Sequence, residues 1–348
     1  MQPPEHIDIP AAWKGAEMAA NPSRWQSTLT GAEIAELEQA ADAYLSRNHT
    51  VGAMTVEEFP LPTLAPRLKA LRQTLLHGVG FELIRGLPVD RYGIETAAAI
   101  FCGIGAHLGS ARSQNAKGHV LGHVKDVGAD LSNPGTRIYQ TAKRQTFHTD
   151  SCDVVGLLCL KEAMEGGDSL LVSTVALYNA LCARRPYLAR LMFAPIATDR
   201  RGEVPPGEKP YFEIPVLNWH AGRLTGLYQR TYIESAARFP EAPKRSAEQI
   251  EALDLFDELA NDPQMHLRMR LQPGDMQFVY NHTLLHDRTE FRDWPEPERR
   301  RHLLRLWLAI PNDRPLPPIF AQRYGSLEIG DRGGIVTEGT RLHVPLAP

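Results

Sequence analysis

Apolar residues recur at helical spacing along the first part of the chain. The segment Thr30-Gly-Ala-Glu33 has the form of a capping box, and apolar residues follow it every three or four positions. Leucines at the same spacing run from Leu64 to Leu75 and stop before a glycine that suits a helix C-cap. These patterns predict a helical region over residues 1–77.

The pattern then changes to short runs typical of strands. A strand is expected within 80–89 and a helix at about 95–107, and from about residue 118 turns rich in Gly, Asn, Asp and Pro separate the runs. This spacing favours an all-β barrel or sandwich. We also expect a hairpin in which Leu267–Leu271 and Met276–Asn281 flank a Pro-Gly-Asp turn. The other strand-like runs are HVLGHV (119–124), RIYQT (137–141), TFHTD (146–150), DVVGLLCL (153–160), SLLVS (169–173) and LTGLYQRTYI (224–233).

Two helices are expected among these strands, at about 174–183 and from a capping box at Ser246 to a stop before Pro263. Residues 199–216 are polar and rich in Pro and Gly, so we interpret them as a loop or lid. Because strands and helices are interleaved, the sequence predicts one large domain. Its β core would span 78–315, and 316–348 would form a C-terminal extension.

Composition narrows the functional classes. The chain has 348 residues, 43% of them apolar, and a formal net charge of -3. That balance gives no excess of positive charge for nucleic acid or an anionic membrane. No apolar run approaches the roughly 18 residues of a membrane span, and the start lacks the pattern of a secretory signal. The four cysteines include no CxxC pair, so we expect a reduced, cytoplasmic setting.

The candidate chemistry begins at Phe147-His148-Thr149-Asp150. In a strand, His148 and Asp150 point to the same face and can bind one metal ion, although a surface hydrogen-bonded pair would look the same. The expected hairpin ends near His282 and His286, either of which could supply a third ligand. Two histidines and one carboxylate are the ligand set of non-haem Fe(II) oxygenases.

A later strand places two arginines on one face. Residues 301–310 alternate so that even positions are continuously apolar, while Arg301 and Arg305 share the opposite face. A buried guanidinium needs an anion, and its planar fork fits a carboxylate. The anion could belong to a ligand, or to Asp and Glu side chains in structural ion pairs.

The order FHTD, GGDS, HDRT and RRHLLRLWL resembles the taurine dioxygenase (TauD/TfdA) family of Fe(II)- and 2-oxoglutarate-dependent dioxygenases. The likeness extends from about residue 78 to 315. It implies a mainly β fold with flanking helices (α+β), whose core is a double-stranded β-helix, the jelly roll of the clavaminate-synthase-like enzymes. It also implies Fe(II), 2-oxoglutarate and O2 as cofactor and co-substrates, with a small molecule as substrate. Homo-oligomerisation is an expectation from the resemblance alone.

Carried over position by position, the resemblance assigns roles to individual residues. The metal ligands become His148, Asp150 and His286, with His286 preferred to His282 because a polar Arg-Thr pair follows it. The arginine for the distal carboxylate of 2-oxoglutarate becomes Arg301. Arg305 matches a second arginine near the metal, and Ser169 matches a hydroxyl after the Gly-Gly-Asp turn that also contacts 2-oxoglutarate; Ser169 could equally be a simple turn residue.

Substrate recognition is less determined by the sequence. Gln114 and Asn115 lie where the family has pocket residues, and they replace a histidine-rich stretch of taurine dioxygenase, so taurine is not the expected substrate. Tyr228 and Arg230 lie on a strand that would border the pocket, with packing or surface roles as the alternative. Asn281 could face the pocket or serve a turn.

The resemblance implies oxidation of an aliphatic C–H bond, with release of succinate and CO2. Hydroxylation is the default outcome, and desaturation or cyclisation would use the same ligands. The carboxylate of Asp150 argues against halogenation, since halogenases of this class have a small residue there. Two other functions fit parts of the pattern: a non-catalytic module that binds 2-oxoglutarate or a small acid, and a zinc hydrolase. The hydrolase leaves the two arginines unexplained.

Overall fold

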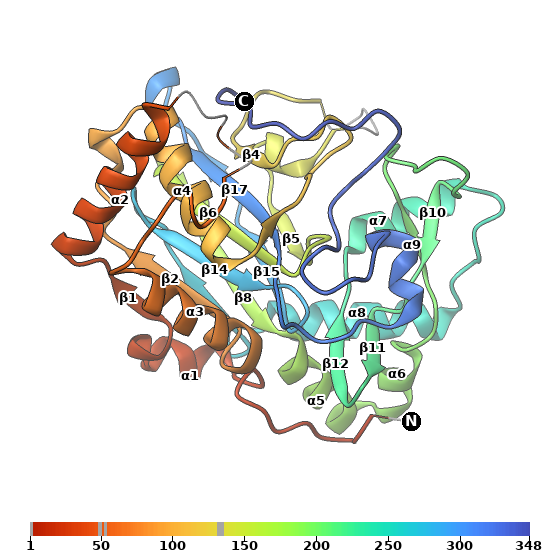
Figure 1. Ribbon diagram of the computed structural model, residues 1–348. Helices are drawn as coiled ribbons and strands as arrows, with labels where there is room; N and C mark the ends of the chain where they lie inside the picture. Colours follow the sequence, from red (N-terminus) through yellow and green to blue (C-terminus); the bar gives the residue numbers. More distant parts are fainter. Residues whose placement is uncertain (1–2, 48–50, 52–53, 131–135) are drawn as a thin grey trace.

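The computed structural model describes residues 3–47, 51, 54–130 and 136–348. Two β-sheets face each other at its centre, and helices cover their outer faces (Figure 1). The larger sheet has seven strands in the order β1-β2-β14-β6-β17-β3, with β4 paired to β17. Its strands are β1 Gln26–Thr28, β2 Phe81–Arg85, β3 Ser110–Ala111, β4 Leu121–Val124, β6 Val154–Lys161, β14 Met276–Tyr280 and β17 His302–Ala309.

The smaller sheet has four strands in the order β13-β8-β15-β5. From β5 onward the chain crosses repeatedly between the two sheets, which is the topology of a double-stranded β-helix and confirms the expected fold. Its strands are β5 Gln145–His148, β8 Ser169–Ser173, β13 His266–Met269 and β15 Leu284–Arg288. Three two-stranded pairs complete the β structure: β7 Glu165–Gly166 with β16 Phe291–Arg292, β9 Ala197–Asp199 with β10 Tyr211–Glu213, and β11 Leu217–His220 with β12 Arg223–Gly226.

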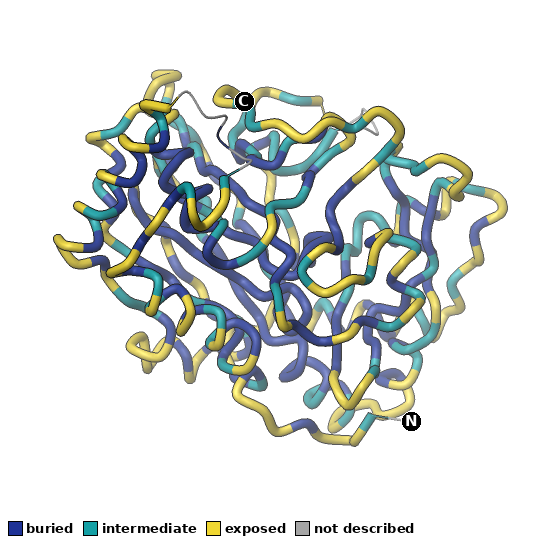
Figure 2. Tube along the Cα trace, viewed as in Figure 1, coloured by how far each residue is buried: buried dark blue, intermediate teal, exposed yellow. Residues whose placement is uncertain are grey.

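The helices form two groups. Apolar side chains of α3 and α4 pack on the outer face of the larger sheet, with α2 against α4, and those of α5 pack on the smaller sheet, with α6 and α8 against α5. The buried core therefore runs through the middle of the molecule, with exposed residues at its periphery (Figure 2). The helices are α1 Gly15–Ala20, α2 Gly31–Leu45, α3 Ala65–His77, α4 Ile94–Leu108, α5 Thr174–Arg184, α6 Pro186–Leu191, α7 Arg230–Ser235, α8 Ala247–Asn261 and α9 Ala321–Tyr324.

Most elements expected from the sequence are present. The capping boxes at Thr30 and Ser246 begin α2 and α8, and Gly78 is the C-cap of α3. On β17 the even-numbered residues pack against the helical layer, while Leu303 and Trp307 face the space between the sheets.

Three expectations about elements are wrong. The hairpin expected around 273–275 does not form, because β13 pairs with β8 in the smaller sheet while β14 pairs with β2 and β6 in the larger one. The run 137–141 forms a 3-10 helix, Ile138–Gln140, instead of a strand. The run 224–233 ends as a strand at Gly226 and re-forms as α7 from Arg230.

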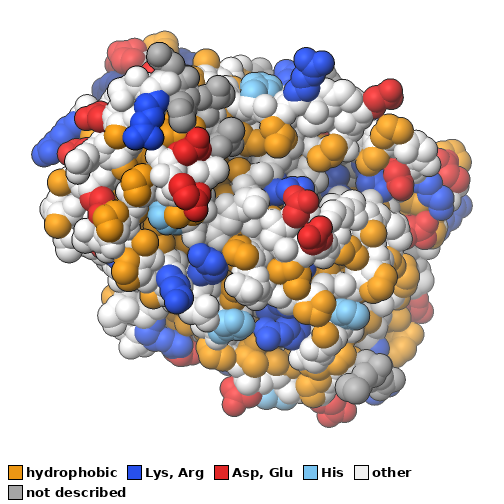
Figure 3. Space-filling model, viewed as in Figure 1, with side chains coloured by type: hydrophobic (Ala, Val, Ile, Leu, Met, Phe, Trp, Pro, Cys, Tyr) orange, Lys and Arg blue, Asp and Glu red, His pale blue; other side chains and the backbone are white. Residues whose placement is uncertain are grey.

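The regions outside the β-helix are tied to it. The N-terminal region supplies β1, which pairs with β2, and the C-terminal segment returns across the molecule so that Gly334 N donates to Ser151 O at 2.7 Å. The loop expected at 199–216 contains β10 and forms a hairpin with β9. Among the described residues, no helix has the length and apolar character that crossing a bilayer requires. Basic and acidic side chains intermingle on the face shown in Figure 3, in keeping with the small net charge.

Candidate active site

Three side chains from two neighbouring strands converge between the sheets. His148 at the end of β5 and His286 on β15 are cross-strand partners, with ring centroids 4.1 Å apart. Asp150 follows β5, and its Oδ1 lies 3.9 Å from His148 Nε2 while its Oδ2 lies 3.7 Å from His286 Nε2. One ligand atom from each residue lies within 4.8 Å of the other two. The structure therefore brings together the three residues that the sequence suggested as metal ligands.

The protonation of this cluster fits a cation. His148 Nδ1 donates to Thr146 O at 2.8 Å, which leaves Nε2 as the nitrogen without a proton; this Nε2 lies 3.9 Å from Asp150 Oδ1 and 2.8 Å from Gln145 Nε2. Burial and the neighbouring His286 lower the pKa of His148 to about 3. Burial alone would raise the pKa of Asp150, but Arg305 and the two imidazoles bring it below its ordinary value. Two imidazoles beside a carboxylate are the donor set that Fe(II) takes in proteins.

The carboxylate of Asp150 is oriented by buried neighbours. Trp307 Nε1 on β17 donates to Asp150 Oδ2 at 2.8 Å, and Arg305 Nη1 lies 3.4 Å from the same oxygen. Asn281 Oδ1 accepts from the backbone N of Asp150 at 3.1 Å and holds the turn after β5. Outer contacts of this kind fix the ligand geometry of metal sites.

His282, the other candidate for third ligand, lies in a different buried cluster. Its Nε2 is 2.8 Å from Asp153 Oδ1 and 3.9 Å from Asp313 Oδ2. Arg332 forms ion pairs with both of these aspartates, at 2.8 and 2.7 Å. Because the guanidinium already pairs with both carboxylates, this second cluster has the composition of a structural ion-pair network.

A cavity beside His148 and His286 ends at Arg301, which is 5% exposed. Arg301 forms no ion pair among the described residues, and its Nη1 is buried without a hydrogen-bond partner there. Its guanidinium packs over the ring of Phe291, 5.1 Å from Cζ to centroid, and burial lowers its pKa to about 10. An uncompensated buried cation of this kind fits the distal carboxylate of 2-oxoglutarate.

Ser169 lines the same cavity at the start of β8, where its hydroxyl donates to Gln277 Oε1 at 3.0 Å. The preceding turn needs its two glycines. Gly166 and Gly167 have φ of 70° and 75°, and a Cβ on Gly167 would lie 2.9 Å from Arg301 Nε. The turn therefore lets the backbone approach the guanidinium closely.

Arg305 lies between this cavity and a second one on the other side of His148. Its Nε donates to Gln114 Oε1 at 2.7 Å, and its Cζ lies 4.7 Å from the centre of the Tyr139 ring. The amide of Gln114 also donates to Arg305 O at 2.7 Å, so Gln114 lines the second cavity and positions Arg305 at the same time.

The other substrate candidates have different surroundings. Tyr228 lines the second cavity, but its hydroxyl donates away from it, to Asp257 Oδ1 at 2.7 Å. Arg230 begins α7 and pairs with acidic residues of that helix and of α8, because the expected strand has become a helix there. Asn115 holds the following turn by accepting from Lys117 N at 3.0 Å. Among the described residues that line the two cavities, neither Arg230 nor Asn115 occurs, and Asn281 acts behind Asp150.

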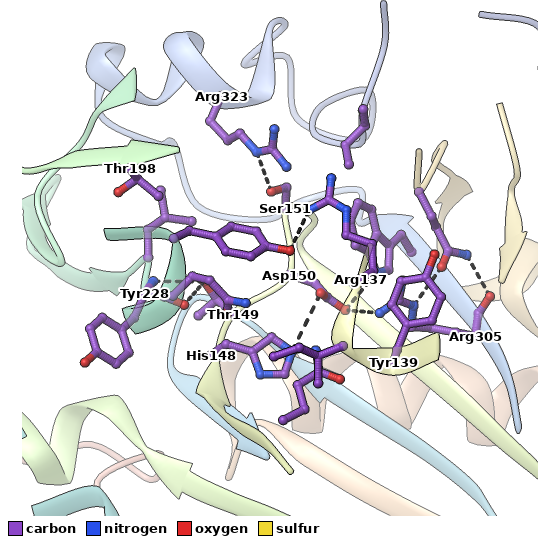
Figure 4. Close-up of a pocket in the computed structure, with 18 of the residues that line it drawn as sticks. Arg137, Tyr139, His148, Thr149, Asp150, Ser151, Thr198, Tyr228, Arg305 and Arg323 are labelled. Atoms are coloured by element: carbon purple, nitrogen blue, oxygen red, sulfur yellow. Dashed lines mark hydrogen bonds and ion pairs between the residues drawn. The ribbon is translucent and has the colours of Figure 1, made fainter. Parts of the chain in front are cut away.

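Sequence reasoning missed several residues of the site. Trp307 shares the face of Arg305 on an alternating strand, which is a signal that could have revealed it. Tyr139 has no such signal, because its segment has the pattern of a strand but forms a 3-10 helix. Arg137 and Arg323 line the second cavity near Asp150 (Figure 4). No pattern in the residues around either arginine indicates that it lies near the metal cluster.

Comparisons with known proteins agree with this geometry. Residues 42–307 match the model of the family described as "Taurine catabolism dioxygenase TauD, TfdA family". The chain is 32% identical over 311 residues to the FR-33289 synthase of Streptomyces rubellomurinus, covering 88% of this chain and 91% of the relative. It is 28% identical over 208 residues to a uridine-5'-phosphate dioxygenase of an Amycolatopsis species, covering 54% of this chain and 71% of the relative.

A solved structure shows the same fold. An asparagine oxygenase in complex with Fe(II), 3-hydroxyasparagine and succinate superposes with a TM-score of 0.64 at 20% identity, covering 82% of this chain and 93% of that one. The family match spans most of the chain, including His148, Asp150, His286, Arg301 and Arg305. The chain therefore belongs to the TauD/TfdA family of dioxygenases, which depend on Fe(II) and use 2-oxoglutarate and O2.

Proposed function

We propose that this dioxygenase hydroxylates an aliphatic C–H bond of a small molecule, with His148, Asp150 and His286 holding the iron. The observation that carries the proposal is the convergence of these three ligand atoms beside a cavity that ends at the unpaired guanidinium of Arg301. The cluster provides a site for a cation, and Arg301 provides a site for an anion next to it. A zinc hydrolase would need only the first of these.

The protein's own contribution is binding and orientation. Arg301 would grip the distal carboxylate of 2-oxoglutarate, with the Ser169 hydroxyl beside it on the cavity wall. Trp307 and Arg305 hold Asp150 in one orientation, and the closely packed apolar residues between the sheets exclude water. When bound, Fe(II) with 2-oxoglutarate and O2 supplies an oxidative decarboxylation that yields succinate and CO2 and oxidises the substrate.

The test follows O2 uptake and succinate formation with Fe(II) and 2-oxoglutarate across a panel of small molecules. The names of relatives and of similar structures suggest including nucleoside monophosphates and polar amino acids in the panel. We expect His148→Ala and Asp150→Ala to lower succinate formation by at least about 100-fold, since each removes a metal ligand. Arg184→Ala, at an exposed ion pair on α5, is the matched control with unchanged turnover.

The alternatives predict other results. A non-catalytic module would bind 2-oxoglutarate but form no succinate with any compound, and a hydrolase would act with Zn2+ and without O2. Product mass separates hydroxylation, which adds one oxygen, from desaturation or cyclisation, which remove two hydrogens. The four free cysteines support the reduced, cytoplasmic setting that we propose for the reaction.

A further inference from the structure

The second cavity is distinct from the one that ends at Arg301. Tyr139, Gln145, His148 and Arg305 border both cavities, so the metal cluster lies between them. The second cavity continues from Asp150 and Ser151 toward the aromatic rings of Phe212 and Tyr232. Since the first cavity suits 2-oxoglutarate, the second is the space that remains for the substrate, and its lining is unusually rich in arginine.

Arg323 has no counter-ion in this cavity. It lies on α9, beyond the residues 42–307 that match the family model, and lines the wall near Phe212. Its Nε donates to Ser151 Oγ at 2.8 Å, and its terminal nitrogens form neither a hydrogen bond nor an ion pair with any described residue. Figure 4 shows its guanidinium beside Ser151, above Asp150. Burial lowers the pKa of Arg323 to about 10, yet the group stays charged at neutral pH.

A second uncompensated arginine lies next to Tyr232. The Cζ atoms of Arg137 and Arg201 both lie 5.4 Å from the centre of the Tyr232 ring. Arg137 is neutralised by an ion pair with Glu203, whereas Arg201 has no ion pair among the described residues and its buried Nε has no partner there. The backbone of Arg201 has a φ of 54°, in the left-handed region that residues other than glycine rarely adopt. The positive charge around Tyr232 therefore exceeds the charge that the Glu203 carboxylate can balance, although Arg201 does not itself line the cavity.

Tyr232 lines the same cavity, and its hydroxyl keeps a hydrogen that it can donate to a ligand there. It accepts from Arg137 Nη1 at 2.5 Å, which leaves its own hydrogen free. A guanidinium with free terminal N–H groups and a phenol with a free O–H can together contact three oxygens of one group. A carboxylate offers two oxygens and one charge, whereas a phosphate ester or phosphonate offers three oxygens and up to two charges.

We propose that Arg323 and Tyr232 form a subsite for a tetrahedral oxyanion on the substrate, a phosphate ester or a phosphonate. The inference rests on the proposed function, because it takes this cavity as the substrate site. Arg137 and Arg201 supply positive charge around Tyr232 without needing direct contact. Since Ser151 is the residue after the metal ligand Asp150, and adjacent Cα atoms lie about 3.8 Å apart, the oxyanion would bind close to the iron. The oxidised carbon is then only a few bonds from phosphorus.

The test compares four probes of similar size: propylphosphonate, propyl phosphate, butyrate and butyramide. Their dissociation constants are measured by calorimetry on the anaerobic protein loaded with Fe(II) and 2-oxoglutarate. We expect both phosphorus compounds to bind at least about 10-fold more tightly than butyrate, with butyramide weakest. Arg323→Gln should weaken the two phosphorus compounds by at least about 30-fold and leave butyramide unchanged, while Arg323→Lys recovers part of the loss. Arg184→Gln removes one exposed positive charge as the control.

Equal affinity for butyrate and propylphosphonate, or no effect of Arg323→Gln on the phosphorus compounds, would overturn the subsite. Preference for propyl phosphate or for propylphosphonate would support it in either case and would identify the source of the oxyanion. If Arg323→Gln does not fold, Tyr232→Phe and Arg201→Gln test the same subsite through its other members. Succinate formed from 2-oxoglutarate is followed in parallel across the full panel of small molecules. Its absence with every compound counts against the dioxygenase proposal, whereas the binding comparison stands without turnover.

Discussion

At the residue scale, the proposed ion pair between Arg301 and 2-oxoglutarate can be tested by a single substitution. Removing one partner of a buried, hydrogen-bonded charge pair costs about 2–5 kcal/mol, or about 30-fold and upward in affinity. We therefore expect Arg301→Gln to raise the KM for 2-oxoglutarate by at least about 30-fold and to weaken its anaerobic binding equally. The exposed Arg299→Gln, two residues earlier, is the control. Unchanged 2-oxoglutarate binding in Arg301→Gln would show that the anion lies elsewhere.

Part of the site could be predicted from the sequence alone, residue by residue. Alternation alone placed His148 with Asp150, and Arg301 with Arg305, because a strand fixes which side chains share a face. It could not choose between His282 and His286, since that choice depends on the register of β15 against β5, which pairs His286 with His148. The choice of His286 therefore came from the resemblance to the family and not from the local sequence pattern.

At the element scale, the errors have a common origin in pairing between distant segments. Leu267–Leu271 and Met276–Asn281 have the local features of a hairpin, yet their strands enter opposite sheets. The turn at 273–275 therefore crosses from one sheet to the other. Likewise Tyr228 and Arg230 are predicted to share one face of a strand, but this strand ends before them, at Gly226. The propensities of the residues predict where a helix or strand begins, but the strands with which a strand pairs depend on the whole fold.

Strand β17 also carries a pH-dependent contact with β4. His123 Nδ1 and His302 Nε2 are 2.7 Å apart, and His123 Nε2 lies 2.9 Å from Pro345 O. Burial lowers the pKa of both histidines, that of His302 to about 3. Because the folded state disfavours the charged forms, their contribution to stability is complete above the unfolded pKa of 6.5 and is lost as the pH falls toward 3.

We therefore expect the free energy of unfolding to fall by about 1 kcal/mol through His302 between pH 7.5 and 5.5, with a contribution of the same sign from His123, measured by urea denaturation. In the double variant His123→Gln/His302→Gln this decrease should be smaller. His77→Gln, at the exposed end of α3, should keep the wild-type decrease. A pH dependence that is the same in the double variant and the wild type would contradict this origin.

At the scale of the whole molecule, the C-terminal extension lines the cavity that we propose as the substrate site. Residues 316–348 supply Arg323 to the cavity wall, and we propose that they form one domain with the helical region 1–77 and the core 78–315. Nothing in the composition of the extension indicates this role, because it depends on where a segment rich in Pro and Gly docks after leaving β17. The docking is fixed by Arg332, which is fully buried between Asp153 and Asp313.

Arg332 therefore links the extension to the turn that follows Asp150. Replacing one member of a buried charge network leaves the others uncompensated and costs about 3–5 kcal/mol. We expect Arg332→Leu to lower the free energy of unfolding by that amount at pH 7, and to weaken binding of propylphosphonate because α9 is no longer held against Ser151. Neutralising the stranded carboxylates in Arg332→Leu/Asp153→Asn/Asp313→Asn should restore part of the stability without restoring the binding. If the single variant lost less than about 1 kcal/mol, the network would not be what anchors the extension.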